Sequence, residues 1–208
     1  EMVDAYCKSF FDAVCTARTM LVQLGPTFEK LNSSIAYHRD VNARNLLVFS
    51  PSDGDFERQT AGAAPSDTSG LEFSVVDFGS STDARAWTGS GEGSWQTENP
   101  TGDARYWSPS SWLRFLGGAE ALSQDADLLR QYSRRLDMFA LAVCALEIIA
   151  KLHTAELPSE AALSALPWSR NVNPHLVRNV QRSWHSYWSF SIRCFDHLAQ
   201  YSRLVCSG

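Results

Sequence analysis

The sequence predicts a mainly helical fold that carries one small β-hairpin. Apolar residues recur at steps of three and four over residues 3–24 and 176–204, which is the period of a helix with one buried face. Residues 138–149 are apolar nearly all round, which indicates a helix surrounded by other helices. Two short apolar runs, 46–49 and 71–76, have the length of strands. With 208 residues, the chain is long enough for one domain with a sizeable core.

Composition argues against several classes of protein. The formal charge of −5 comes from 23 acidic and 18 basic residues without a basic run, so nucleic acid is not an expected partner. The five cysteines form no C-x-x-C pair, which argues against a zinc ribbon. No membrane span is expected, because the best apolar stretch, residues 138–150, is short and contains Glu147. Residues 1–4 lack the order of a signal peptide, so the default expectation is cytoplasmic, but secretion stays open because the sequence does not show where the whole protein begins.

The elements follow one another without an internal repeat. The first helix is expected to end where Gly25 and Pro26 break its period, and residues 27–34 are expected to form a polar connection. The two strands are expected to pair as a hairpin that brings Asn45 close to Asp77. The expected segments are a long helix over 1–25, a polar loop and strand over 35–49, a flexible insertion over 50–70, a strand, a motif and a loop over 71–110, an expanded connection over 111–136, a central buried helix over 137–152 and helices over 175–205.

Two expectations concern the middle of the chain. Small and polar residues over 79–102 predict a mobile loop. Residues 113–135 are expected to form one or two irregular helical pieces, and Asp137 is expected to cap the N-terminus of the central helix.

Two short motifs carry the candidate chemistry. Within residues 37–48, Asp40 and Asn45 stand five positions apart just before the first strand, and Asp77 follows the second strand. Carboxylate and amide oxygens in this arrangement are the set that phosphoryl transfer from Mg-ATP uses. Each residue alone has a simpler interpretation as a loop cap, a turn residue or a strand-end cap, but coincidence would then have to explain all three.

These motifs resemble those of the large, mostly helical C-terminal lobe of a eukaryotic protein kinase, and the resemblance extends over residues 1–208 as a divergent member. The similar motifs, in the family's order, are His38-Arg39-Asp40 with Asn45 for the catalytic loop, Asp77-Phe78-Gly79 for the metal-binding motif that opens the activation segment, and Asp137 to Ala142 with Glu147 for the central buried helix. The resemblance implies a mainly α fold, a helical bundle around the central helix, in which the small hairpin carries the catalytic and metal-binding loops.

The resemblance also implies a function. The family transfers the γ-phosphate of ATP to a hydroxyl of a protein substrate, with Mg²⁺ as the metal. The Gly-rich loop and the Lys of the family's N-terminal lobe are missing from this sequence. An N-terminal kinase lobe is therefore an implied partner, and the lobe alone is expected to be inactive.

Roles follow from the resemblance residue by residue. Asp40 is implied as the catalytic base and Arg44 as a cationic group beside it. Asn45 and Asp77 are implied to hold Mg²⁺ and with it the nucleotide, and Leu47 to line the ATP site.

Other residues are implied to support or regulate this site. Phe78 with His38 is similar to the family's apolar spine, Gly79 completes the metal-binding motif, and Asp137 belongs to the central helix. Arg39 is implied to receive a phosphate or an acidic group from the activation segment. The candidate phosphosites are Thr88, Ser90, Ser94 and Thr97, and Glu92 and Glu98 are possible acidic substitutes.

The chain departs from the family pattern at several positions. Asn42 stands where serine/threonine kinases usually have Lys, whereas the following Ala43-Arg44-Asn45 resembles receptor-type tyrosine kinases. Ser110 replaces the Glu that usually ends the activation segment, and Asp103 stands where Thr is common. The type of substrate hydroxyl is therefore left open.

Three functions are compatible with parts of this pattern. An active protein kinase is favoured by the intact base and the two oxygen ligands. A pseudokinase that acts as a binding or scaffolding module is suggested by Asn42, Ser110 and the expanded loops. A small-molecule kinase of the aminoglycoside or choline type shares the Asp-x-x-x-x-Asn loop, but the motif at Asp77 and the helix at Asp137 argue against it.

Overall fold

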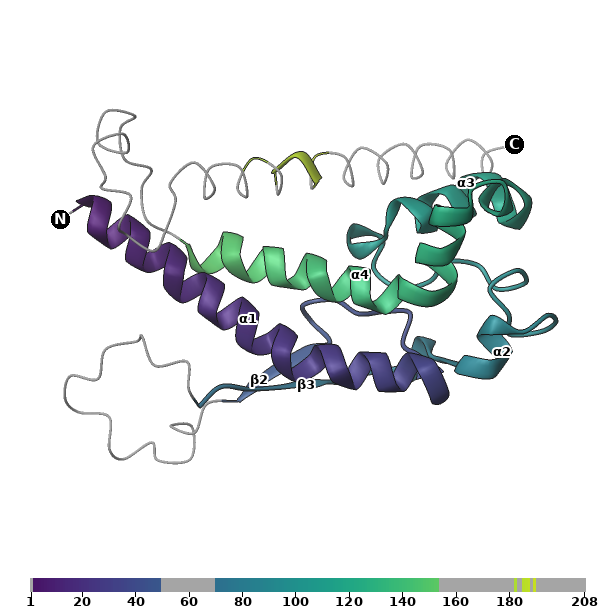
Figure 1. Ribbon diagram of the computed structural model, residues 1–208, viewed down its shortest axis with the longest axis horizontal. Coiled ribbons are helices and arrows are strands. Elements are labelled where there is room, and N and C mark those ends of the chain that lie inside the picture. The colour runs from purple at the N-terminus through teal and green to yellow at the C-terminus, as the bar shows by residue number, and fades with distance from the viewer. Residues whose placement is uncertain (1, 50–69, 154–181, 183–184, 188, 190–208) are drawn as a thin grey trace, which may run out of the picture.

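The computed structural model describes residues 2–49, 70–153, 182, 185–187 and 189 (Figure 1). The elements are α1 (Met2–Ser34), β1 (Ala36–Tyr37), β2 (Leu46–Phe49), β3 (Glu72–Val75), the 3-10 helix η2 (Phe78–Ser80), β4 (Thr82–Asp83), α2 (Ala84–Thr88), the 3-10 helix η3 (Ala104–Tyr106), α3 (Pro109–Ser123) and α4 (Ala126–Leu152). The described chain is mainly helical, as predicted, and it contains two small two-stranded sheets where one hairpin was expected. The insertion predicted over 50–70 and the helices predicted over 175–205 lie almost wholly outside the described residues.

Helix α1 continues through Gly25 and Pro26, so the predicted end of the helix and the predicted connection over residues 27–34 are wrong. A proline inside a helix costs about 3 kcal/mol, because it removes one hydrogen bond and crowds the preceding turn. Leu24 and Phe28 are 3% and 0% exposed, and complete burial of each such side chain contributes about 1.5–3 kcal/mol. Packing on both sides of the proline therefore offsets its cost.

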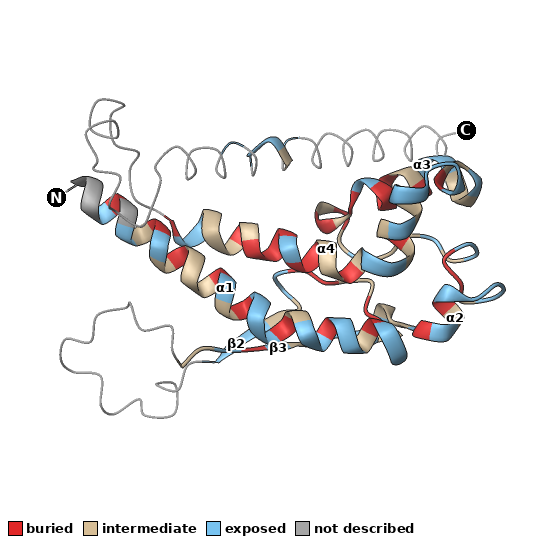
Figure 2. Ribbon diagram, in the orientation of Figure 1, coloured by how far each residue is buried: buried red, intermediate tan, exposed pale blue. Residues whose placement is uncertain are grey.

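Helices α1 and α4 pack against each other in antiparallel directions (Figures 1 and 2). Asn32, near the end of α1, bonds to Asp137 of α4, whereas Ser9, near the start of α1, contacts His153 just after α4. No described helix is long and apolar enough to cross a membrane. The buried residues of the main core are Ala17, Met20, Leu24, Phe28, Val41, Phe73, Tyr106, Ala140, Leu141, Val143, Cys144 and Ala145.

Helix α4 begins at Ala126, well before the predicted start at Asp137. Asp125 is its N-cap, with Oδ1 accepting hydrogen bonds from the backbone N–H groups of the first turn, so the prediction that Asp137 caps this helix is wrong. Arg135 has non-helical angles, φ −131° and ψ 15°, which kink the helix two residues before Asp137. The residues predicted as the central helix, 137–152, are the part of α4 after this kink. Helix α3, broken at Gly118, and the start of α4 are the irregular helical pieces predicted over 113–135.

A second core joins the short elements after the hairpin to α4. A mobile loop was predicted over residues 79–102, but this segment contains strand β4, which pairs with β1, and helix α2. The prediction of a loop is therefore wrong for these two elements. Asp83 caps α2 by accepting from the N–H groups of Arg85 and Ala86, both at 2.9 Å. Trp87 of α2 is fully buried, and its indole N–H donates to the carbonyl of Ser133 at 3.1 Å. The buried members of this core are Tyr37, Ala84, Trp87, Trp95, Leu122 and Tyr132.

Strands β2 and β3 form the predicted hairpin, in which Leu46 pairs with Val75. Gln23 of α1 attaches the hairpin to the helix. Its Nε2 donates to the carbonyl of Leu71 at 2.8 Å, and its Oε1 accepts from the N–H of Phe73 at 2.8 Å. The side-chain amide therefore pairs with the edge of β3 much as another strand would.

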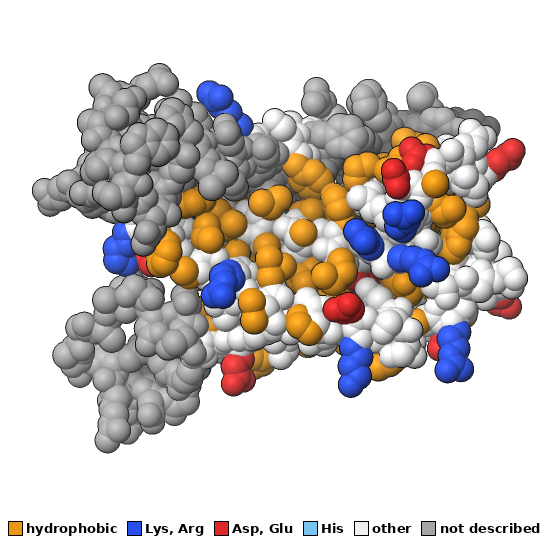
Figure 3. All heavy atoms as spheres, viewed as in Figure 1, with side chains coloured by type: hydrophobic (Ala, Val, Ile, Leu, Met, Phe, Trp, Pro, Cys, Tyr) orange, Lys and Arg blue, Asp and Glu red, His pale blue; other side chains and the backbone are white. Residues whose placement is uncertain are grey.

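The hairpin also leaves apolar side chains uncovered. Leu47, Val48 and Phe49 are 40%, 53% and 49% exposed. Val22 of α1 is exposed as well, and Figure 3 shows hydrophobic side chains spread over much of the described surface on one face of the molecule.

Candidate active site

Residues 38–45 form the loop between β1 and β2, and a buried carboxylate holds the start of this loop. Asp137 accepts hydrogen bonds from the backbone N–H of His38 at 2.7 Å, the N–H of Arg39 at 2.9 Å and the Nδ2 of Asn32 at 2.7 Å. Burial raises the pKa of Asp137, and these three hydrogen bonds oppose the rise. Arg39 has φ 68°, an uncommon conformation for a residue with a side chain, so Asp137 stabilises a strained backbone.

His38 connects the loop to the motif after β3. Its Nδ1 accepts from the N–H of Asp40 at 3.3 Å, so the ring proton is on Nε2, which donates to the carbonyl of Val76 at 3.1 Å. The ring also lies 4.7 Å from the ring of Phe78, measured between centroids. His38 is fully buried, whereas Phe78 is 43% exposed, so one side of this predicted spine pair is open.

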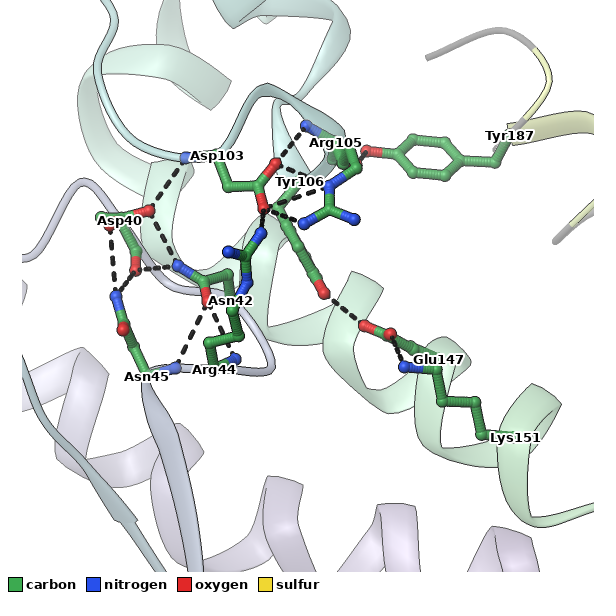
Figure 4. Close-up of polar contacts among 10 residues, drawn as sticks. All are labelled: Asp40, Asn42, Arg44, Asn45, Asp103, Arg105, Tyr106, Glu147, Lys151 and Tyr187. Carbon is green, nitrogen blue, oxygen red and sulfur yellow. Dashed lines mark hydrogen bonds and ion pairs between the residues drawn. The ribbon is translucent and has the colours of Figure 1, made fainter. Parts of the chain in front are cut away.

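The carboxylate of Asp40, the predicted base, is held from three directions (Figure 4). Its Oδ1 accepts from Nδ2 of Asn42 at 2.8 Å and from the backbone N–H of Asp103 at 2.9 Å. Its Oδ2 accepts from Nδ2 of Asn45 at 3.2 Å. Donors from the loop itself and from residue 103, far along the chain, therefore fix the orientation of this carboxylate.

Gly102 permits the close approach of residue 103 to the loop. It has φ 81°, and a Cβ atom there would lie 2.6 Å from both the carbonyl oxygen of Arg39 and the Oδ1 of Asp40. Only glycine fits this position without displacing the loop. In the sequence, Gly102 was one small residue among many and carried no separate signal.

The two predicted metal ligands lie at the ends of the paired strands. The backbone N–H of Val76 donates to the carbonyl of Asn45 at 2.9 Å, which brings the residue before β2 beside the residues that follow β3. Asn45 uses its Nδ2 on Asp40, so its side-chain oxygen is the atom left for a cation. Asp77, exposed and at φ 64°, uses Oδ1 to accept from the N–H of Gly79 at 3.2 Å.

One amide oxygen and one carboxylate suit Mg²⁺, which prefers oxygen ligands and takes one or two carboxylates together with phosphate oxygens and water. Within the described part of the chain, no group of three or more His, Cys, Asp or Glu side chains is placed to hold a metal ion. A magnesium ion held by Asn45, Asp77 and phosphate oxygens would not need such a group. Leu47 lies beside these residues in β2, with its side chain partly exposed.

Arg44 forms neither a hydrogen bond nor an ion pair with the carboxylate of Asp40. Its side chain is 76% exposed, and its Nη2 lies 3.1 Å from Oδ2 of Asp103. Asp103 is also bonded by Arg105, at 2.6 Å between Nη2 and Oδ2. Burial favours a higher pKa for Asp103, but the hydrogen bonds and charge of Arg105, with the charge of Arg44, hold this pKa below its ordinary value. Arg44, the predicted cationic group beside the base, thus belongs to a cluster with Asp103 and Arg105 at the edge of the site (Figure 4).

Arg39 meets an acidic residue of the segment that was predicted to carry phosphate. Its Nη1 lies 3.3 Å from Oε2 of Glu98, and its Nη2 donates to the carbonyl of Asn99 at 3.0 Å. The guanidinium also lies over the ring of Trp87, 5.2 Å from the centroid. Of the two acidic substitutes considered, Glu98 is the one that pairs with Arg39.

Arg114 of α3 holds the same segment from the other side. This buried guanidinium donates to the carbonyls of Trp95, Gln96 and Glu98, at 3.3, 2.9 and 3.0 Å. Of the candidate phosphosites, Thr88, Ser90 and Thr97 are exposed. Ser94 is fully buried, with its hydroxyl 3.3 Å from that of Thr97, so the segment would have to open before Ser94 met another protein.

The end of this segment is anchored without the missing carboxylate at Ser110. The hydroxyl of Ser110 is buried 2.6 Å from that of Ser108, which caps α3. A few residues earlier, Tyr106 donates its hydroxyl proton to Glu147 of α4. Burial, together with Glu147, raises the pKa of Tyr106. The sequence placed Glu147 in the central helix but carried no signal for its partner.

Sequence reasoning missed several residues that shape the site. Asn42 was noted only as a departure, yet it is buried and bonded to Asp40. Gly102 and Arg114 were not singled out at all, and nothing in the sequence pointed to the hydrogen bond from Asn32 to Asp137. Each acts on residues 15 or more positions away or through a backbone angle, and neither relation leaves a local pattern.

The chain was compared with protein-family models, with curated proteins and with solved structures, and none of them matches it.

Proposed function

We propose that this chain is the C-terminal lobe of a protein kinase, which transfers the γ-phosphate of ATP to a hydroxyl of a protein substrate. One observation carries the proposal. Asp40 is oriented by Asn42, Asn45 and the N–H of Asp103, within the same loop whose Asn45 lies beside the strand end that carries Asp77. A held carboxylate next to two oxygen ligands is the arrangement that phosphoryl transfer needs.

Each residue has a distinct part in this proposal. Asp40 orients the substrate hydroxyl and takes its proton. Asn45 and Asp77 hold Mg²⁺, which neutralises the charge of the phosphate oxygens. The cluster around Asp103 carries Arg44 and Arg105 at the edge of the site, where a protein substrate would approach.

An N-terminal lobe is the proposed partner of the hairpin. Leu47, Val48 and Phe78 are all about half exposed, and they lie on or next to the strands that carry Asn45 and Asp77. A lobe that covers ATP would bury this apolar surface, which stabilises such contacts by roughly 25 cal/mol per Å². Phosphoryl transfer is accordingly expected from the protein with both lobes, whereas the chain alone lacks the Lys that positions the phosphates.

The test is nucleotide binding followed by phosphoryl transfer. Calorimetry on the two-lobe protein should show ATP binding that EDTA weakens, and radiolabelled ATP should phosphorylate a protein acceptor. Asp40→Asn should retain magnesium-dependent binding and lose transfer by at least about 10²-fold, because only the proton acceptor is altered. Asp77→Asn should instead weaken the magnesium dependence of binding.

The outcome also decides the alternative. If the wild-type protein binds no nucleotide at any magnesium concentration, protein kinase activity is excluded. The alternative, a pseudokinase that serves as a binding module, then remains. Exposed Asp127 of α4 provides a control, since Asp127→Asn should change neither measurement.

A further inference from the structure

The side chain of Asn42 lies between the predicted base and the predicted metal ligand. It is 4% exposed. Its Nδ2 donates to the carbonyl of Asp40 at 3.1 Å and to Oδ1 of Asp40 at 2.8 Å. Its Oδ1 accepts from the N–H of Arg44 at 2.9 Å and the N–H of Asn45 at 3.3 Å. An amide side chain has two donor hydrogens and two acceptor lone pairs, so all four are in use and none is left for a substrate.

These contacts distinguish the two oxygens of Asp40. Oδ1 has two donors, the side chain of Asn42 and the backbone N–H of Asp103, at 2.8 and 2.9 Å. Oδ2 has one, Nδ2 of Asn45 at 3.2 Å. The oxygen with fewer and longer hydrogen bonds keeps more capacity to accept another proton.

The same side chain shapes the backbone that follows. The backbone N–H of Arg44 donates to Oδ1 of Asn42. The N–H of Asn45 has a second acceptor, the carbonyl of Asn42 at 3.0 Å. Asn42 thus links the carboxylate of Asp40 to the turn that presents the side chains of Arg44 and Asn45.

We propose that Asn42 is a positioning residue, which holds Oδ1 of Asp40 so that Oδ2 faces the substrate and sets the spacing between Asp40 and Asn45. This inference rests on the proposed function. In the step it serves, the substrate hydroxyl gives its proton to Oδ2 of Asp40, its oxygen forms a bond to the γ-phosphorus, and the bond from that phosphorus to the bridging oxygen breaks, which leaves ADP. Being neutral and fully bonded, Asn42 does not contact the transferred phosphate.

Two variants separate the two parts of this role, which are holding the carboxylate of Asp40 and holding the backbone of the loop at Arg44 and Asn45. Asn42→Ala removes all four hydrogen bonds. Asn42→Asp keeps the acceptor for the N–H groups of Arg44 and Asn45, but it replaces the donor to Asp40 by a carboxylate that repels it. Asn99→Ala is the matched control, because Asn99 is exposed and uses its backbone carbonyl, rather than its side chain, to bond Arg39.

Amide hydrogen exchange tests the loop and does not depend on catalysis. In Asn42→Ala, the N–H of Arg44 should lose its protection, whereas the N–H of Asn45 should keep part of it through the carbonyl of residue 42. In Asn42→Asp, both should remain protected. Unchanged exchange of Arg44 in Asn42→Ala would overturn the loop half of the proposal.

Kinetics on the two-lobe protein tests the base. Asn42→Asp should lower kcat by about 10²-fold with little change in KM, since a base displaced by about 1 Å costs roughly that factor. A kcat equal to that of wild type in Asn42→Asp would overturn the positioning of Asp40. A wild-type protein without transfer activity would refute the proposed function and, with it, the positioning of a catalytic base by Asn42, and the exchange pattern would then report on the loop alone.

Discussion

The antiparallel pair of α1 and α4 buries a titratable side chain at each end, and the two ends differ in what surrounds it. At one end, called the polar end, Asp137 receives three hydrogen bonds from Asn32, His38 and Arg39. At the other, called the aromatic end, His153 packs edge-on against Tyr6 and Phe10, with ring centroids 4.5 and 5.5 Å away, and its one polar contact with a described residue is with Ser9.

The difference shows where the fold imposes precise geometry. Apolar contacts at the aromatic end are non-directional, so neighbouring side chains can adjust to a substitution. Hydrogen bonds at the polar end are directional, and a buried donor that loses its acceptor costs about 1–3 kcal/mol. The candidate site is attached to the polar end, so substitutions there should alter both stability and site geometry.

The largest effect is expected from Asp137→Ala. It leaves the N–H groups of His38 and Arg39 and the amide of Asn32 without their acceptor, and the free energy of unfolding should fall by about 3–5 kcal/mol. Urea unfolding measures the loss, and amide exchange at His38 and Arg39 locates it.

Asp137→Asn serves if the alanine variant does not fold, and it should lose less stability because its carbonyl oxygen still accepts from the loop. Asp127→Ala, at an exposed position of the same helix, is the control and should change stability by less than about 1 kcal/mol. Equal midpoints for Asp137→Ala and Asp127→Ala would show that this carboxylate does not hold the polar end.

The next effect concerns the contact between Gly102 and the loop. Gly102→Ala should lower the free energy of unfolding by about 2 kcal/mol, because φ is 81° and the new Cβ would lie 2.6 Å from the carbonyl of Arg39. Gly25→Ala is the control. Apart from its chain neighbours and the backbone of α1, a Cβ at Gly25 meets no atom within 4 Å. The gain of about 0.5–1 kcal/mol for alanine inside a helix is opposed there by crowding against the ring of Pro26, so the free energy of unfolding should change by less than about 1 kcal/mol. An equally small change for Gly102→Ala would contradict the close approach at Gly102.

A smaller effect is expected from Glu98→Gln. The ion pair with Arg39 is partly exposed, so the loss should be about 1 kcal/mol or less. Amide exchange over residues 94–99 should nevertheless become faster, because the carboxylate helps to hold this segment against the loop. Glu92→Gln, exposed and in the same segment, should leave exchange unchanged. Identical exchange in the two variants would mean that Arg114 alone holds the segment.

The smallest effect concerns pH at the aromatic end. Burial lowers the pKa of His153 below its ordinary value of about 6.5, so the unfolded chain binds the proton more readily. The contribution of neutral, buried His153 to the free energy of unfolding is fully present above about pH 6.5. It is lost as the pH falls through the pKa of His153 in the folded protein. His153→Phe should therefore lose less stability than wild type between about pH 7 and pH 5, measured by urea unfolding at each pH. Parallel curves would show that His153 does not titrate on unfolding.

The sequence by itself determined the mainly helical class, the hairpin of β2 and β3, and the residues proposed for the chemistry. Periodicity and short motifs report on neighbours in the chain, and these features are local. Asp40 and Asn45 lie in one loop, and two apolar runs predicted that β2 and β3 pair, although not which residues face each other.

Only the tertiary structure decided the boundaries of the long helices and the way the loop is held. Packing against α4 overrides Pro26 in α1, and the carboxylate of Asp137 serves the loop rather than its own helix. Arg39 reaches Glu98, and Asp40 reaches the N–H of Asp103, across about sixty positions of the chain. Contacts at such separations depend on the summed packing of every element between them, which no local pattern records.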